Sequence, residues 1–343
     1  MTSCPQNCER RGGLIHAQFS AGWDRAQPLV RSLPDEQAPS PALLILLGIL
    51  AGAALAFLFS EHVLWMRPAL QPAFAVTKFF VGSLVRPDQV RVFLAAPLRA
   101  LIGLLGQYTI MPICAWLVSL AFSDPALRTG IVLVGCMPGA MASNVMTVLL
   151  RGDLILSVTL TSLATLLCPL VIAIWLPLLA DTRMEVPVGP MVWNAVWMVV
   201  LPVVAGIALR NYRPRMPRGW DAVATAIASV AIVLIILVVV AANRERLAQL
   251  GPTLALGMVV LNLGAYGLAF GAATALRWPR AQRRTLVIEV GMQNAGLGSV
   301  LALAHLGEAG AVPSAFYTAL CVITAAIALP FSRNRNRGLA KPD

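Results

Sequence analysis

The sequence predicts an all-α, polytopic membrane protein with ten transmembrane helices. Three observations lead to this fold class. The chain of 343 residues is 58% hydrophobic and only 12% charged, whereas a soluble domain carries about a quarter charged residues. The apolar residues form long runs, and about 20 such residues span roughly 30 Å of hydrocarbon. Two of these runs are interrupted by glycine and polar amides where a spanning helix is normally most apolar.

Charged residues, proline and glycine separate the runs from one another. Residues 1–40 are polar and carry four prolines, which predicts a disordered tail or an over-extended start of the reading frame. Residues 332–343 form a basic tail. The predicted spans are 41–59, 68–85, 92–121, 127–150, 154–178, 187–209, 219–242, 251–276, 281–306 and 312–331.

Arginine clusters predict how the chain is oriented. The net charge of +11 does not indicate nucleic-acid binding, because the arginines lie in short clusters between apolar runs. Cytoplasmic loops of membrane proteins are enriched in such residues. With the N-terminus inside, clusters of four arginines in 210–218 and 277–284 fall in the cytoplasm. The outside loops keep only Arg67, Arg128, Arg183, Arg244 and Arg246. We therefore expect a bacterial inner-membrane protein with both termini cytoplasmic.

Enzyme and resident-metal chemistry are not expected. Cys4 and Cys8 lie in the polar tail without a nearby histidine pair, so they make a poor metal site. An intramembrane hydrolase needs paired aspartates or a serine–histidine dyad. Asp153 stands alone at a helix end, and His305 has no serine in a nucleophile signature. We expect no enzyme activity and no organic cofactor.

The two interrupted runs lie in the fourth and ninth spans. The fourth reads GCMPGAMASNVMTVLLRGD (135–153), and the ninth reads EVGMQNAGLGSVLALAH (289–305). Asn144 and Asn294 are about 150 residues apart, close to half the chain. Five spans in each half is an odd number, so the second half enters the membrane from the opposite side. This pattern is typical of inverted repeats whose broken helices meet near the midplane.

A broken helix exposes backbone groups that can bind ions. Carbonyls at the end of one half-helix can coordinate a cation, and amides at the start of the next suit an anion. Apart from Asp221 near the start of the seventh span, Glu289 is the one acidic residue predicted within a span, about 7–8 Å beyond Arg284 at ~1.5 Å per residue. A buried carboxylate in a membrane is functional by default. The alternative is that Glu289 reaches the interface or pairs with Arg283 or Arg284.

Neutral oxygens accompany this carboxylate. Ser143 and Asn144 follow the interruption of the fourth span, and Ser157 and Thr161 share one face of the fifth because they are four residues apart. Each serine or threonine alone is more often a helix-packing residue. Hard cations prefer oxygen ligands, and one carboxylate among neutral oxygens suits a monovalent ion.

These segments resemble the two signature segments of the bile acid:sodium symporter family. The matching stretches are GAMASNVMTVLLRGDLILSVTLTSLATLLCP (139–169) and EVGMQNAGLGSVLALAH. Further similarity lies in GQYTIMP (106–112), VGSLVRPD (81–88) and YTALCVITAAIALPF (317–331). The resemblance covers essentially everything after the tail.

The resemblance implies two inverted five-helix repeats. Residues 41–85 and 187–242 would form a panel of helices 1, 2, 6 and 7. Residues 92–178 and 251–331 would form a core in which discontinuous helices 4 and 9 cross. Two coupling Na⁺ ions are implied. The first would bind Ser143, Asn144, Ser157, Thr161 and Glu289. The second would bind Gln107, Glu289, Gln293 and the backbone carbonyls of Val290 and Met292.

The resemblance also implies sodium-coupled symport of a small organic anion by alternating access. Pyruvate, pantoate or another carboxylate is expected, and a bile-acid-like compound stays open. A proton-coupled carrier or exporter with Glu289 as proton carrier is the alternative, and a sensor or scaffold is a third. The substrate would lie near Met141, Ala142, Asn294 and Ala295. The oligomeric state is not predicted.

Two departures from the family pattern concern the substrate. Many relatives carry Gly-Thr where this chain has Ala140 and Met141, and the threonine position lies near the substrate in the family. Lys78 stands in the second span, where relatives usually carry an apolar residue. It either extends to the interface near Arg86 or faces the cavity and pairs with a substrate carboxylate.

Overall fold

The computed structural model describes residues 60–84, 97–140, 142–181, 183–213 and 244–333, with short pieces between 216 and 241. The first predicted span, half of the seventh, the predicted tail 1–40 and residues 334–343 of the other predicted tail lie outside these residues. Regular structure in the described part is helical, apart from one isolated bridge between Gly139 and Gln293. Four described helices are long and apolar enough to cross a membrane: Leu98–Ser119, Leu154–Leu179, Val188–Tyr212 and Gly251–Ala275.

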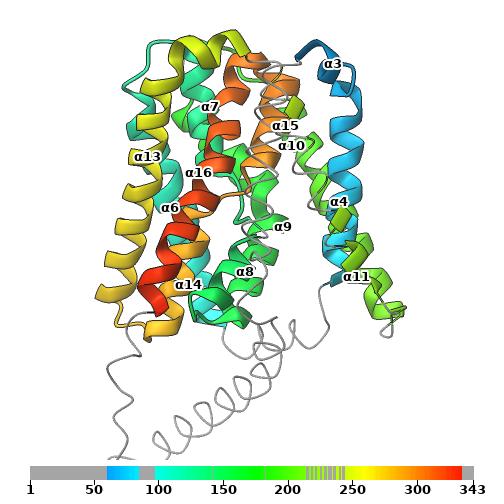
Figure 1. Ribbon diagram of the computed structural model, residues 1–343, viewed down its shortest axis with the longest axis vertical. Helices are drawn as coiled ribbons and strands as arrows, with labels where there is room; N and C mark the ends of the chain where they lie inside the picture. Colours follow the sequence, from blue (N-terminus) through cyan, green and yellow to red (C-terminus); the bar gives the residue numbers. More distant parts are fainter. Residues whose placement is uncertain are drawn as a thin grey trace, which may run out of the picture. The chain divides into compact units, whose positions relative to one another are not determined.

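The helices follow the chain in the order that Figure 1 labels. They are α3 (Ser60–Leu64), η1 (Arg67–Ala69), α4 (Leu70–Leu84), α6 (Pro97–Ser119), α7 (Pro125–Cys136), α8 (Ala142–Leu149), α9 (Leu154–Leu179), α10 (Val188–Ala195), η2 (Val196–Val200), α11 (Leu201–Tyr212), α13 (Arg244–Ala275), α14 (Arg280–Gly291), α15 (Ala295–His305) and α16 (Gly307–Arg333).

Two described helices begin before the predicted spans that they contain. The apolar stretch Gly251–Ala275 agrees with the predicted span 251–276, but helix α13 already starts at Arg244, since the stretch RERLAQL holds strong helix formers and no glycine or proline. Helix α16 starts at Gly307 rather than 312, because a single residue, Leu306, suffices for the turn after α15. Gly307 has φ +77°, a backbone conformation that glycine adopts without steric cost.

The sixth predicted span is continuous but not uniform. Helices α10 and α11 are joined by η2, five residues of π-helix. Pro202 follows directly in α11 and has no amide hydrogen to donate to the preceding turn. The π-turn before this proline accommodates the missing hydrogen bond, so the helix continues without a break.

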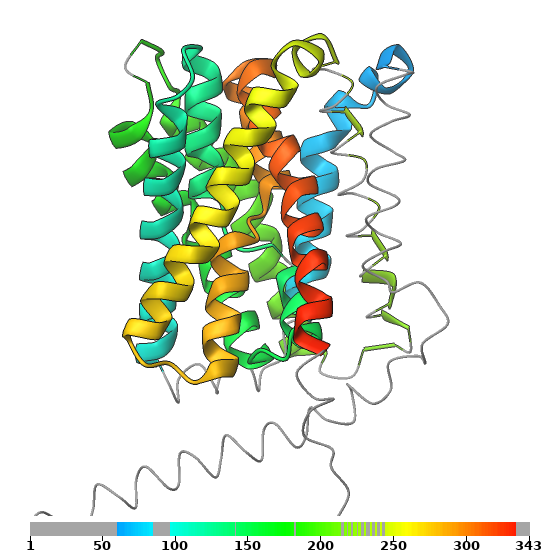
Figure 2. The same cartoon turned by 60° about the vertical axis from the view of Figure 1, so that its left-hand side comes forward.

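Helices α4 and α11 pack closely through glycine. A Cβ on Gly82 would lie 2.2 Å from the carbonyl oxygen of Val203, and one on Gly206 would lie 2.2 Å from that of Phe79. Such small residues allow helix backbones to approach each other in membranes. Figure 1 shows the pair at the right-hand side of the described helices, and in the turned view of Figure 2 α4 lies partly behind α16.

A larger group of helices forms the rest. Helix α6 packs against α7 and α13, α16 packs against α7 and α15, and α14 packs against α13 and α9. Helices α7 and α15 lie toward the upper end in Figure 1, whereas α8 and α14 lie toward the lower end. The pair described above meets this group where α10 packs against α9 and α15, and α4 against α15.

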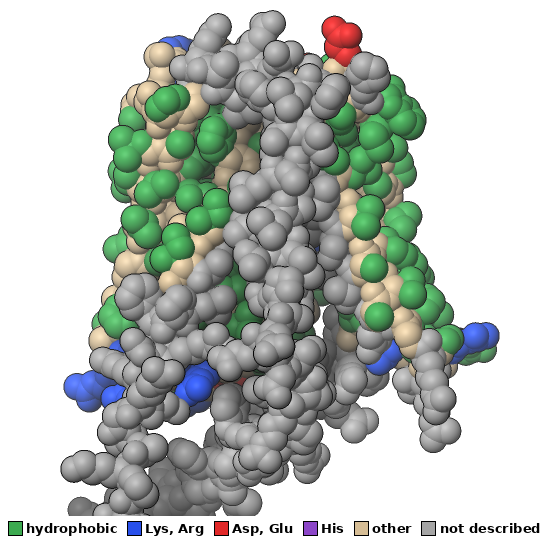
Figure 3. Space-filling model, in the orientation of Figure 1, with side chains coloured by type: hydrophobic (Ala, Val, Ile, Leu, Met, Phe, Trp, Pro, Cys, Tyr) green, Lys and Arg blue, Asp and Glu red, His purple; other side chains and the backbone are tan. Residues whose placement is uncertain are grey.

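The outer surface of the described helices is apolar. Hydrophobic side chains cover their sides in Figure 3, and the visible lysine and arginine side chains are concentrated at the lower end. Leu98 and Leu178 are more than two-thirds exposed, at 67% and 69%. So much exposed apolar surface marks an interaction site, and for long apolar helices the partner is lipid.

Candidate ion and substrate site

The fourth and ninth predicted spans are both interrupted. Helix α7 ends at Cys136 and α8 begins at Ala142, and α14 ends at Gly291 before α15 begins at Ala295. Pro138 explains the first break, because the residue before a proline disfavours helical backbone. That residue, Met137, has φ −73° and ψ 153°, which is extended.

The two breaks lie side by side and satisfy each other's backbone. The amide of Ala140 donates to the carbonyl of Met292 at 2.7 Å, and the amide of Asn294 donates to that of Pro138 at 2.7 Å. These bonds flank the antiparallel bridge of Gly139 with Gln293. Each break thus supplies the partner that the other lacks, which a membrane interior demands.

Glu289 is fully buried, at 0% exposure, beside this crossing. Its Oε1 accepts hydrogen bonds from Ser143 at 2.6 Å and from Ser157 at 2.5 Å. Its Oε2 accepts one from Thr161 at 2.8 Å. Asn144 joins through Ser157, whose hydroxyl lies 2.9 Å from Asn144 Oδ1. The carboxylate of α14 is therefore surrounded by oxygens of α8 and α9.

Glu289 makes no ion pair with the described residues. The two arginines proposed as alternative partners point elsewhere. Arg283 donates to Thr274 at 3.1 Å, and Arg284 donates to the carbonyl of Leu150 at 3.2 Å. The carboxylate therefore lies within the bundle without a cationic side chain to balance it.

Two buried amide side chains lie close to the break at Gly139 and to the same carboxylate. Gln107 is buried in α6, and neither its Nε2 nor its Oε1 has a hydrogen-bond partner among the described residues. Gln293 donates to the carbonyl of Val290 at 2.7 Å, but its Oε1 also lacks a partner in this part of the chain. A Cβ on Gly139 would lie 2.6 Å from Glu289 Oε2 and 3.7 Å from Gln107 Nε2. Each unsatisfied buried group costs about 1–3 kcal/mol, so this cluster points to a ligand.

The donor set suits a hard monovalent cation. It offers carboxylate, hydroxyl, amide and carbonyl oxygens with one negative charge. Within the described residues, no three histidine, cysteine, aspartate or glutamate side chains come together as a metal site. The carbonyls of Val290 and Met292 each accept one hydrogen bond already. A second lone pair remains on each oxygen.

Comparison with known proteins agrees with this geometry. Residues 71–251 match the model of the Sodium Bile acid symporter family. The chain is also 34% identical to an uncharacterized sodium-dependent transporter, YocS of Bacillus subtilis, over 79% of this chain and 84% of that protein. The chain belongs to the sodium/bile acid symporter family.

Other family relatives are longer than this symporter-family chain. It is 30% identical to BASS1 of Arabidopsis thaliana, named a probable sodium/metabolite cotransporter of chloroplasts, over 68% of this chain and 58% of that protein. It is 32% identical to the P3 protein of Bos taurus, over 72% of this chain and 52% of that protein. The match thus spans less than two thirds of these two proteins.

The residues expected near the substrate lie at the starts of the second half-helices. Ala142 begins α8, and Ala295 begins α15. Asn294 caps α15, where its Oδ1 accepts from the amide of Leu297 at 3.4 Å. Met141 lies outside the described residues. Lys78 is buried in α4, with its ammonium 5.2 Å from the centre of the Phe74 ring.

Sequence reasoning missed several residues that hold this family site together. Asn262 Nδ2 and the Tyr317 hydroxyl each donate to the carbonyl of Gly291 at 2.9 Å, the last residue of α14. Thr147 lies 3.1 Å from the Ser157 hydroxyl. Asn262 is an amide within an apolar run, and Thr147 is four residues after Ser143, so both had a detectable signal. Tyr317 had none.

Proposed function

We propose that this chain is a sodium-coupled symporter of a small organic anion that works by alternating access. One observation carries the proposal: the buried carboxylate of Glu289 accepts three hydroxyl hydrogen bonds and has no cationic partner among the described side chains. An isolated ionised carboxylate is costly in a membrane. A bound cation removes that cost.

The ions would occupy two sites that share Glu289. The hydroxyls of Ser143, Ser157 and Thr161 would turn their lone pairs from the carboxylate toward the first Na⁺, with Asn144 as a further ligand. The Ser157 hydroxyl has a single proton to donate, although several oxygens lie within hydrogen-bond distance of it. Its own lone pairs can therefore coordinate a cation. Gln107, Gln293 and the carbonyls of Val290 and Met292 would bind the second Na⁺ together with Glu289.

Because both sites use the Glu289 carboxylate, bound ions would hold the two crossing segments in one arrangement. The first site draws on α8, α9 and α14, and the second adds α6 and the break before α15. Binding therefore ties together segments that are far apart in the chain. We propose that this fixes the starts of α8 and α15, where Met141, Ala142, Asn294 and Ala295 would receive the carboxylate.

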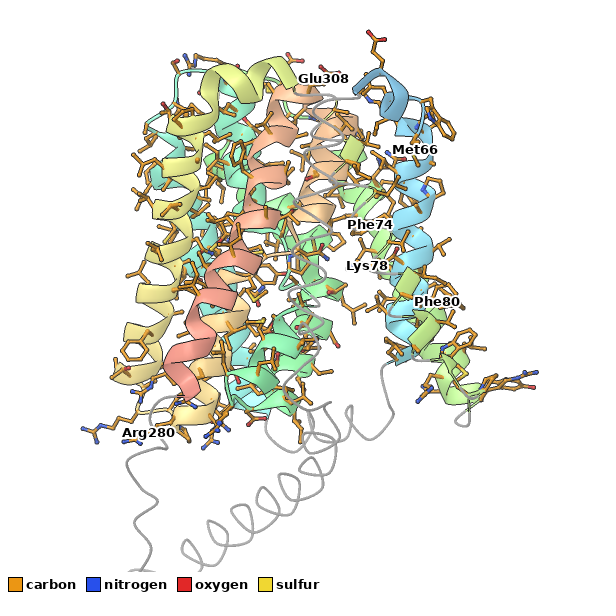
Figure 4. The ribbon with its side chains drawn as sticks, viewed as in Figure 1. Met66, Phe74, Lys78, Phe80, Arg280 and Glu308 are labelled. Carbon is orange, nitrogen blue, oxygen red and sulfur yellow. The ribbon has the colours of Figure 1, made fainter. Side chains whose placement is uncertain are left out.

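We further propose the panel and core of ten helices in two inverted repeats. Helix α4 with α10 and α11 would belong to the panel, and the helices around Glu289 to the core. Two polar contacts join the groups near Glu308 (Figure 4). Arg67 pairs with Glu308 at 3.1 Å, and Asn194 lies 2.7 Å from His305 Nε2. Both contacts would have to break when the core moves.

The orientation follows from charge. The visible basic side chains are concentrated at the end that holds Arg280, opposite Glu308 (Figures 3 and 4). Under the positive-inside rule this end is cytoplasmic. We propose a bacterial inner-membrane location with both termini cytoplasmic, so the contacts of Arg67 and Asn194 would close the outer side.

Proton coupling through Glu289 is the second candidate, since a protonated carboxyl also fits among hydroxyls. Uptake into proteoliposomes separates the two. With [¹⁴C]pyruvate and pantoate as probes, we expect uptake driven by an imposed sodium gradient and lost in Glu289→Gln. Uptake that follows a pH gradient in sodium-free buffer would reject sodium coupling in favour of the proton.

A further inference from the structure

Lys78 is an unusual residue for its position. The sequence has two lysines, Lys78 and Lys341, and every other basic side chain apart from histidine is arginine. Lys78 lies within α4 and is only 2% exposed. A lysine that extends to the membrane interface keeps its ammonium group in water. The burial of Lys78 contradicts that reading.

No counter-charge for Lys78 lies within the described residues. The ion pairs found there join Arg67 to Glu308, and Arg128 and Arg183 to Asp181. The contact that Lys78 does make is with Phe74, whose ring centre is 5.2 Å from Nζ. A cation–π contact is weaker than the cost of burying an ammonium without a counter-charge. This contact alone therefore does not compensate for the burial of Lys78.

Phe74 connects Lys78 to the start of α15. A Cβ on Gly296 would lie 4.0 Å from Phe74 Cε2 and 3.7 Å from Asn294 Oδ1. Gly296 is the second residue of α15, an 11-residue helix whose N-terminal amides carry partial positive charge. Figure 4 places Phe74 and Lys78 on the side of α4 that is turned toward the other helices. The ring thus has a buried ammonium and a helix N-terminus as neighbours.

We propose that Lys78 and the N-terminus of α15 bind the carboxylate of the transported substrate, with Phe74 as the apolar wall of the site. The inference rests on the proposed function and names its substrate class: a small aliphatic carboxylate, with its apolar part on Phe74. The substrate supplies the negative charge that Lys78 lacks. A neutral amide of the same shape leaves the ammonium unpaired and is excluded.

The test is ligand binding to the purified full chain. Choline salts of pyruvate and pantoate are titrated in sodium chloride and in choline chloride, and thermal unfolding is followed, with pyruvamide as the neutral probe. In Lys78→Met we expect carboxylate affinity at least about tenfold weaker, the loss typical of a desolvated charge contact. The sodium-induced shift stays at the wild-type value. Lys78→Arg keeps the charge and binds within a few fold, and Val76→Met, on the exposed face of α4, binds as the wild type.

Wild-type carboxylate affinity in Lys78→Met, or equal binding of pyruvamide and pyruvate, overturns the proposal. A wild type that binds carboxylate through Lys78 but ignores sodium refutes the proposed coupling and leaves this inference standing. Should Lys78→Met fail to fold, reductive methylation of the Lys341→Arg variant, in which Lys78 is the one remaining lysine, provides a second readout. We expect pantoate, but not its neutral amide, to slow methylation of Lys78 as measured by mass spectrometry; neither compound has a ketone that reacts with amines under reducing conditions. An unchanged rate contradicts the assignment.

Discussion

Replacing Glu289 with glutamine tests the proposed ion site with little change in volume. The carboxylate accepts hydrogen bonds at 2.5–2.8 Å from three hydroxyls. The glutamine oxygen can accept from Ser143 and Ser157, whereas its NH₂ cannot accept from Thr161. The loss of one hydrogen bond to a charged group costs about 1.5–3 kcal/mol. More importantly, a bound Na⁺ loses the one formal negative charge of its site.

The size of the sodium response follows from linkage. At a sodium concentration about a hundredfold above Kd, binding stabilises the folded chain by about 2.7 kcal/mol. For a chain of this length about 1 kcal/mol raises the unfolding temperature by about 2 °C. We therefore expect an upward shift of about 5 °C in the wild type and none in Glu289→Gln.

The assay compares sodium chloride with choline chloride at equal ionic strength, so that screening by salt is the same in both. Thermal unfolding of the purified chain is followed in detergent. Glu308→Gln is the matched control, because this carboxylate is 46% exposed and pairs only with Arg67 among the described side chains. We expect Glu308→Gln to show the same sodium-induced rise in unfolding temperature as the wild type. A full shift in Glu289→Gln would refute the assignment of the carboxylate to the ion site.

Three further substitutions and one control probe two close approaches and one hydrogen bond in the fold. Gly139→Ala puts a Cβ 2.6 Å from the Glu289 carboxylate and should abolish the sodium-induced shift in unfolding temperature. Gly264→Ala, the control, has open space around it; it should keep this shift and gain up to about 1 kcal/mol in the free energy of unfolding. Gly206→Ala puts a Cβ 2.2 Å from a backbone oxygen of α4 and should lower stability by about 1–3 kcal/mol, so an unchanged unfolding temperature would contradict the close helix packing. Tyr317→Phe removes one of two donors to the Gly291 carbonyl, with an expected loss of about 1 kcal/mol in thermal unfolding; no loss would mean that the remaining donor suffices.

Local composition was sufficient for the membrane class and for the two interruptions. Pro138 and Gly139 lie in the fourth span, and a short Gly–polar stretch lies in the ninth. Proline lacks the amide hydrogen that a helix needs, and glycine has no side chain to support one. Both effects act within a few residues, so the position of such a break can be predicted from the sequence alone. The starts of α13 and α16 could not be read in this way, because charged residues before the apolar run extend α13 and because the turn before α16 needs only Leu306.

By itself the sequence determined which oxygens are available and that Glu289 needs a partner inside the membrane. Only the tertiary structure decided which of them meet: that Glu289 faces Ser157 and Thr161 rather than arginine, and that Lys78 is buried without an ion pair to any described carboxylate. The physical reason is the separation along the sequence over which each kind of interaction acts. Helix breaks depend on neighbours a few residues away, whereas the partners of a buried charge come from helices more than a hundred residues apart and exist only once those helices pack.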